Sequence, residues 1–196
     1  MRRLFRLLVA AAALAAAGCA SPPRTVGPGW VGNDRFAFEL LTPWSRIPRG
    51  RDPDVNVEQL TRSGPLLDRL FIASLEPGEG LVTPGFEAYP RWWAGTPARA
   101  LDDFLTDSLE TLGYAPVEVV WKTERPFAGA SGMLYALALR QPGGLRLSGA
   151  AMAAVHGERL DLVLFIAPDE HYFPARRGEL EHAFDSLMRP PESVRR

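Results

Sequence analysis

Four apolar segments in the second half of the chain constrain its fold more than any other feature. Each segment has the length of a strand and either alternates or is apolar throughout, and together they cover residues 117–123, 133–140, 145–156 and 160–167. The connections between them are short, and Gly157-Glu158 predicts a tight hairpin turn. Because short connections favour antiparallel neighbours, the segments predict an antiparallel meander. The nearly all-apolar segment 160–167 is expected to be central in the sheet.

Two helices are expected beside this meander. Residues 97–112 place apolar side chains at helical spacing, and Thr96 and Gly113 are the expected caps. A second helix is expected to start near Phe173-Pro174. The apolar face of the first helix consists of Leu101, Phe104, Leu105, Leu109 and Leu112, and that of the second of Leu180, Ala183, Phe184, Leu187 and Met188. We expect both helices to pack on one face of the sheet.

Three further strands are expected upstream, at residues 35–41, 55–61 and 67–75. The fold class expected is therefore α+β, an antiparallel meander sheet of about six to seven strands with two amphipathic helices packed on it. A single domain should span residues 34–189, followed by a polar tail at 190–196. One domain agrees with the length of 196 residues.

The N-terminus indicates export. Arg2, Arg3 and Arg6 precede an apolar run that ends at Ala17, and this run is too short to span a bilayer. Gly18-Cys19 follows, with small residues before it, which resembles the lipobox of bacterial lipoproteins. The resemblance implies a signal peptide at 1–18 and acylation of Cys19. There are two alternatives to a lipoprotein signal: an ordinary cleaved signal peptide with an incidental cysteine, and a short membrane helix.

The resemblance to lipoproteins also suggests a location. Ala20 is not the aspartate that keeps such proteins in the inner membrane, so the expected location is the outer membrane, facing the periplasm. Residues 19–33 are rich in proline and glycine and are expected to form a flexible tether between the lipid and the domain. The domain would then work close to the membrane.

Composition excludes several classes of function. The formal net charge is −1, and it falls to about −4 once the three signal-peptide arginines are removed, so nucleic acid is not an expected partner. Cys19 is the only cysteine, so no disulfide can form within the chain. The domain must be stable through its core alone.

The order of these elements on an export signal resembles the Mog1/PsbP-like group of small α+β proteins. The residues that carry the resemblance are Phe36-Ala-Phe-Glu-Leu with Pro43-Trp44, the helix 97–112, the Gly157-Glu158 hairpin, the strand 160–167 and the last helix with Phe184. A Tyr-Pro-Arg-Trp segment is also similar to uncharacterised proteobacterial lipoproteins. The group implies binding or assembly roles, and it brings no catalytic residues to this chain.

No motif indicates catalysis or a cofactor. Ser131 lies in Gly-Ala-Ser-Gly, which lacks the spacing and the following helix of a nucleophile elbow. His156, His171 and His182 do not have metal-binding spacing, so neither a metal nor a cofactor is expected. The carboxylates Asp102, Asp103 and Asp107 are expected on a solvated helix face.

An aromatic segment is the one candidate binding feature. Trp, Tyr and Arg are enriched at binding hot spots, and a patch of these types is expected from Tyr89, Arg91, Trp92, Trp93, Tyr172 and Phe173. Phe86 lies in the same segment. The alternative is that the rings are buried against the end of the sheet.

The function expected is therefore a membrane-anchored periplasmic lipoprotein that acts as a non-catalytic binding or assembly module. Its expected partners are the membrane, through Cys19, and a protein or other component of the cell envelope. The first alternative is a small-ligand carrier with an apolar pocket between helices and sheet. The second alternative is a hydrolase.

Overall fold

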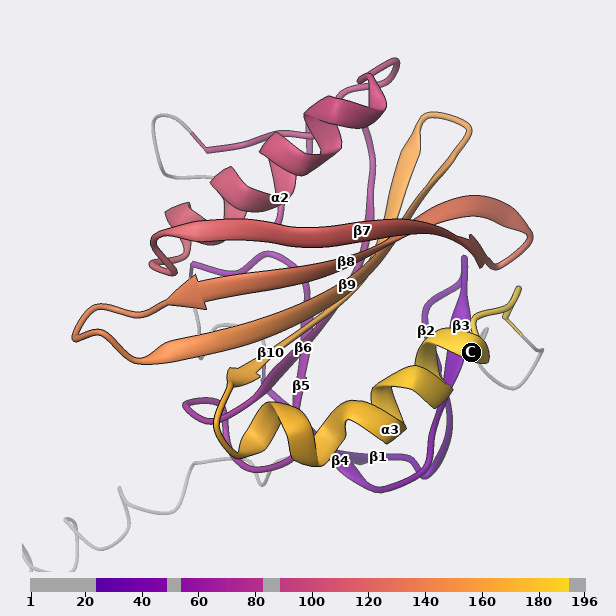
Figure 1. Ribbon diagram of the computed structural model, residues 1–196. Helices are drawn as coiled ribbons and strands as arrows, with labels where there is room; N and C mark the ends of the chain where they lie inside the picture. Colours follow the sequence, from indigo (N-terminus) through magenta and orange to yellow (C-terminus); the bar gives the residue numbers. More distant parts are fainter. Residues whose placement is uncertain (1–23, 49–53, 83–88, 191–196) are drawn as a thin grey trace, which may run out of the picture.

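The computed structural model describes residues 24–48, 54–82 and 89–190. One eight-stranded sheet has the order β1-β4-β5-β6-β10-β9-β8-β7, and β2 and β3 form a separate pair (Figure 1). The predicted α+β class, with an antiparallel meander and two helices, is confirmed, and the sheet has more strands than expected. The elements are β1 (Arg24–Val26), β2 (Gly29–Gly32), β3 (Ala37–Leu40), β4 (Trp44–Arg46), β5 (Glu58–Thr61), β6 (Arg69–Leu75), α2 (Ala98–Thr111), β7 (Val117–Phe127), β8 (Ala130–Arg140), β9 (Arg146–His156), β10 (Arg159–Pro168) and α3 (Tyr172–Asp185).

The meander β7 to β10 pairs in sequence order, and β10 lies between β9 and β6. Only the two end residues of β10 are not buried, as expected for a central strand. The predicted loop at 126–132 is much shorter than expected. Ala128 and Gly129 alone connect β7 and β8, both with positive φ, which suits the right-handed twist of a two-residue hairpin.

The two helices lie on opposite faces of the sheet, which corrects the expectation that both pack on one face (Figure 1). Leu105 and Leu109 of α2 pack with Phe71 of β6, whereas Phe184 of α3 packs with Leu70, the preceding residue of β6. Successive strand residues point to opposite faces, so β6 and β10 supply apolar side chains to two cores. We call the two sides the α2 face and the α3 face. The apolar pattern of a helix does not specify which face of a sheet it covers.

The last helix ends earlier than predicted. It stops at Asp185, so Leu187 and Met188 are not part of its apolar face. The backbone of Met188 instead pairs with Ala37, through N···O distances of 2.9 and 3.0 Å, and its side chain is 42% exposed. This pairing fixes the C-terminal segment to β3.

Strands are present upstream of Asp34, in residues where the sequence predicts the tether. Residues that were expected to belong to the tether form β1 and β2, and Val31 is buried in the α3-face core. Gly27 and Pro28 form the corner between β1 and β2. Cys19 and the predicted signal peptide lie outside the described residues, as do Phe86 and residues 191–196 of the predicted tail.

No helix in the described part of the chain is long and apolar enough to cross a membrane.

Candidate binding groove

The half of the α3 face over β8 and β9 is only partly covered. On β8, the residues that face α2 are buried, including Tyr135 and Leu137, whereas Leu134 and Ala136 on the α3 face are half-buried. The helix α3 lies over β9, β10 and β3 and leaves this area open to one side. A groove of about 490 Å³ results between α3 and the sheet.

The floor and one wall of this groove are apolar. Leu134, Ala136 and Ala150 form the floor, and Phe173, Leu180 and Phe184 of α3 form the wall. Arg125, Arg177, Glu181 and Asp185 form a charged rim. Ligand sites in proteins combine an apolar lining with a few charged groups in this way.

Trp121 reaches the groove because of a β-bulge in β7. Val119 pairs with Leu137 and Trp121 pairs with Ala136, so Val120 is an extra residue in the strand. Since side chains alternate between faces, the extra residue turns Trp121 to the α3 face. Regular alternation along β7 would place Trp121 on the α2 face with Val117 and Val119, and the bulge places it on the α3 face instead. The indole is 50% exposed at the mouth of the groove.

Charged side chains close one end of the groove. Arg125 of β7 forms an ion pair with Asp185, the last residue of α3. Arg177 and Glu181 are exposed on α3, one turn apart, and no ion pair to either is seen within the described residues. The rim therefore carries both signs of charge and does not select for one sign.

The adjacent tryptophans of the predicted patch have opposite environments. Trp92 is 1% exposed, its ring packs edge-on against Phe104 of α2, and its Nε1–H donates to the Glu158 carbonyl at 2.7 Å. Trp93 is 57% exposed. Trp92 is thus a core residue, and only Trp93 offers its ring to solvent.

The predicted patch does not form one surface. The guanidinium of Arg91 lies 4.5 Å from the ring centre of Tyr89, and the next residue, Trp92, belongs to the core on the α2 face. Tyr172 and Phe173 pack into the core on the α3 face, where Phe173 lies 5.8 Å from the ring of Phe165. The sheet separates Trp92 from Tyr172 and Phe173, and of the six predicted residues only Phe173 lines the groove.

A serine, an aspartate and a histidine come together elsewhere on the α3 face. The Asp161 carboxylate is 2% exposed, accepts a hydrogen bond from Ser74 Oγ, and has Oδ2 2.9 Å from Nδ1 of His156. Only a quarter of the His156 side chain is exposed. Nucleophilic catalysis requires the imidazole between serine and carboxylate. Here the carboxylate is in the middle, so His156 does not activate Ser74.

The one lysine of the chain belongs to a second polar cluster, on the α2 face. Lys122 Nζ lies 2.5 Å from Oδ2 of Asp102, which makes Asp102 a paired residue of α2 rather than a solvated one. Burial, together with the negative charge of Asp102, raises the pKa of Tyr135 far above its ordinary value. The phenol therefore stays protonated at neutral pH and can serve as a hydrogen-bond donor but not as a base.

No group of three or more potential metal ligands is present among residues 24–48, 54–82 and 89–190.

Comparison with known proteins shows the fold. No model of a protein family and no curated protein sequence matches this chain. Among solved structures, it is similar to cyanobacterial PsbP (CyanoP) from Synechocystis, with a TM-score of 0.54 and 11% sequence identity over 87% of this chain and 95% of the other. A protein of unknown function from Pseudomonas aeruginosa aligns with a TM-score of 0.41 and 15% identity, over 80% of this chain and 99% of the other. The resemblance to a PsbP-like fold noted in the sequence is thus confirmed at the level of the fold.

Proposed function

We propose that this chain is a lipid-anchored, non-catalytic binding module of the bacterial cell envelope. Its binding surface is the groove between α3 and the sheet, and its partner is a protein segment that presents a large apolar side chain. The observation that supports this proposal most directly is the position of Trp121. A β-bulge turns its side chain to the mouth of an apolar groove, where it is half exposed.

A protein partner suits the surroundings of this groove. β7 is an edge strand of the sheet, and most of its residues between Val117 and Phe127 are exposed. A partner segment can therefore lie along β7 and insert one side chain beside Trp121. Exposed tryptophans next to apolar pockets are frequent anchors of such contacts.

The arrangement of polar groups supports a role without catalysis. The Ser74–Asp161–His156 cluster has the wrong order for nucleophile activation, and Tyr135 holds its proton. Besides Tyr135, the polar residues that line the groove are two arginines and two carboxylates, and the lining contains no histidine, serine or cysteine. Binding is the activity that this lining supports.

The envelope location rests on the N-terminal sequence. The apolar run and Gly18-Cys19 resemble a lipoprotein signal, with Ala20 favouring the outer membrane. Acylation of Cys19 would hold the domain at the membrane surface.

Site-specific photo-crosslinking in living cells tests the groove. A photoreactive phenylalanine analogue replaces Trp121 in one variant and Trp93, which is similarly exposed, in the control. We expect a crosslink from position 121 whose mapped site is an apolar segment of another envelope protein, and none to that protein from position 93. Trp121→Ala should abolish co-purification of that protein, and Trp93→Ala should preserve it. An absent crosslink at 121, or equal crosslinks from both positions, would contradict the proposal.

The volume of the groove also favours a second candidate, a small-ligand carrier, because about 490 Å³ is typical of small-molecule sites. Native mass spectrometry of the purified protein distinguishes the two. A carrier retains a small apolar molecule in the wild type and loses it in Ala136→Trp, whose larger side chain fills the floor.

A further inference from the structure

The loop between β5 and β6 is held in one shape by a buried carboxylate. Asp68 is 1% exposed and accepts hydrogen bonds from Thr61 Oγ1 at 2.6 Å, from the Arg62 backbone N–H at 2.8 Å and from the Ser63 backbone N–H at 3.0 Å. The Thr61 hydroxyl in turn accepts from the Gly64 N–H at 2.9 Å. The loop is therefore a preorganised structure rather than a loose connection.

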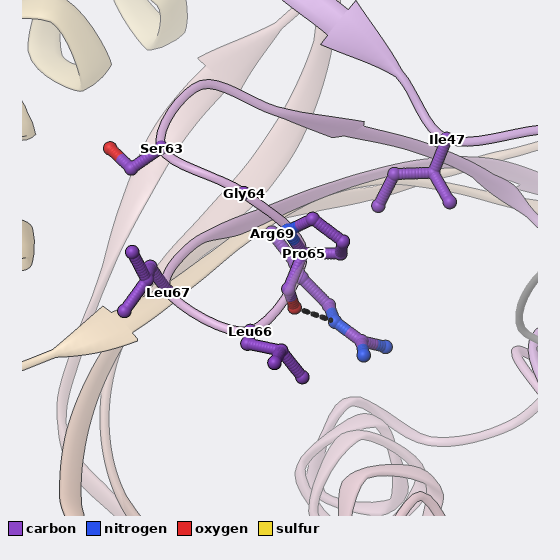
Figure 2. A pocket seen from close by; sticks show the side chains of 7 residues that line it. All are labelled: Ile47, Ser63, Gly64, Pro65, Leu66, Leu67 and Arg69. Atoms are coloured by element: carbon purple, nitrogen blue, oxygen red, sulfur yellow. Dashed lines mark hydrogen bonds between the residues drawn. The ribbon is translucent and has the colours of Figure 1, made fainter. Parts of the chain in front are cut away.

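This rigid loop exposes an apolar side chain. Leu66 is 82% exposed, the largest value for a large apolar residue in the described part of the chain. A shallow pocket of about 750 Å³ adjoins it, and Ile47, Pro65 and Leu67 also line that pocket (Figure 2). Arg69 Nε donates to the Pro65 carbonyl at 2.7 Å and further fixes the loop. Leu66 therefore projects an apolar side chain into solvent from a fixed loop, beside the apolar lining of this pocket.

The start of the domain lies next to this pocket. Arg24 pairs with Arg46 across β1 and β4, and the next residue, Ile47, lines the pocket. Adjacent strands are about 5 Å apart and consecutive Cα atoms 3.8 Å apart, so Arg24 is within roughly 10 Å of Ile47. Arg24 is the fifth residue after Cys19, and five residues of fully extended chain reach about 17 Å. A lipid on Cys19 is therefore confined close to the Leu66 pocket.

We propose that the Leu66 loop is a membrane-docking surface, on which Leu66 enters the lipid headgroup region beside the acylated N-terminus. The inference rests on the lipid anchor of the proposed function. The bilayer is the occupant because the short connection to Cys19 keeps the acylated N-terminus, and with it the membrane, within reach of this pocket. The exposed cation Arg24 at the same edge suits anionic headgroups. Docking would fix the orientation of the domain, and the chain would not swing freely about its anchor.

The test uses the full acylated chain on vesicles of phosphatidylethanolamine and phosphatidylglycerol. An environment-sensitive fluorophore is attached through Leu66→Cys in one variant and through Leu145→Cys in the control, which is 46% exposed at the β8–β9 turn. Cys19 is acylated and does not take the label. Both positions carry the same fluorophore, so any tendency of the label itself to insert is matched.

We expect the fluorophore at position 66 to shift to the blue and to be quenched several-fold more strongly by nitroxide-labelled lipid than the one at 145. Equal lipid quenching at the two positions, or strong quenching at 66 by aqueous iodide, would overturn the inference. Protection at 66 without lipid quenching would also overturn it, because another copy of the chain would then cover the loop.

Flotation of the vesicles separates this inference from the proposed anchor. If the wild-type chain, processed in the bacterium, fails to float with vesicles, the anchor itself is absent and the docking proposal is rejected with it. If the chain floats and position 66 stays in water, the anchor stands and only the docking surface is rejected. Neither result affects the crosslinking test at Trp121.

Discussion

At the scale of single residues, Trp92 and Trp93 show how completely the role of a side chain depends on its direction. Trp92 fills the α2-face core and its indole N–H has a carbonyl partner, whereas the ring of Trp93 lies outside. The sequence Trp-Trp identified an aromatic segment, but no local pattern specified which ring points inward. That choice follows from the position of Phe104 on a helix that comes later in the chain.

The first prediction concerns this pair. Trp92→Ala should reduce the free energy of unfolding by about 3–5 kcal/mol, because it removes a buried ring and leaves the Glu158 carbonyl without its donor. Trp93→Ala should change it by less than about 0.5 kcal/mol. Urea denaturation followed by circular dichroism measures both values. Comparable losses in the two variants would contradict the assignment of Trp93 to the surface.

The second prediction concerns Tyr135. Burial raises its pKa in the folded state, so the native protein keeps a proton that the unfolded chain loses above about pH 10. Stability from this group is therefore complete below about pH 10 and is lost as the pH rises above it, by about 1.4 kcal/mol per pH unit. Denaturation curves of the wild type between about pH 8 and pH 11 should show this loss, and those of Tyr135→Phe should lack it. Parallel pH profiles would show that Tyr135 ionises as readily in the folded protein.

At the scale of elements, α3 is held by one carboxylate as well as by its apolar face. Glu179 accepts hydrogen bonds from the Thr42 backbone N–H at 3.2 Å and from Trp44 Nε1 at 3.1 Å, and it pairs with Arg62 at 3.0 Å. Its side chain is only 9% exposed. This residue therefore ties the helix to β4 and to the start of the β5–β6 loop.

The third prediction follows from this connection. Glu179→Ala should destabilise the protein by about 3–5 kcal/mol, because the donors of Thr42 and Trp44 lose their acceptor and Arg62 loses its partner. Glu181→Ala, two residues along the same helix but exposed, should cost less than about 0.5 kcal/mol. Thermal or chemical denaturation of the two variants checks the difference. A small effect at Glu179 would mean that the apolar face alone holds α3.

The elements were predictable from sequence to different degrees. Strands 145–156 and 160–167 and the helix 97–112 have strong periodic patterns, and the structure has β9, β10 and α2 at nearly those residues. The bulge at Val120 has no such pattern, because one extra residue in a strand is set by its pairing with β8. The groove depends on that bulge and on the face that α3 covers, so it could not be predicted as a site.

At the scale of the whole molecule, the structure changes the part of the N-terminal segment that was expected to form a tether. Arg24 already belongs to the sheet, so ten residues of the expected tether, from Arg24 to Asn33, lie in or beside β1 and β2. A segment rich in proline and glycine can form either a linker or a corner between strands, and its composition does not tell the two apart. The burial of Val31 in the α3-face core distinguishes the two cases.

The fourth prediction tests the anchor. Replacement of Cys19 by alanine removes the thiol that accepts the lipid, so the variant should lose metabolic labelling with palmitate and leave the membrane fraction. Ala20→Asp should keep the label and move the protein from outer-membrane to inner-membrane fractions. Fractionation of cells that express each variant provides the measurement. Membrane retention of the Cys19→Ala variant would contradict the anchor.

Because the two helices pack on opposite faces of the sheet, the two cores can be completed only at different stages of synthesis. The α3-face core joins Phe36, Phe38 and Trp44 to Leu180 and Phe184, and the Ala37–Met188 pairing closes it. During synthesis, or passage of the chain through a membrane with the N-terminus first, these early aromatic residues emerge before α3. Their burial is completed only when the last helix is available to pack on them. Until then they remain accessible to chaperones. Any chain that stops before residue 180 keeps that side of its sheet uncovered.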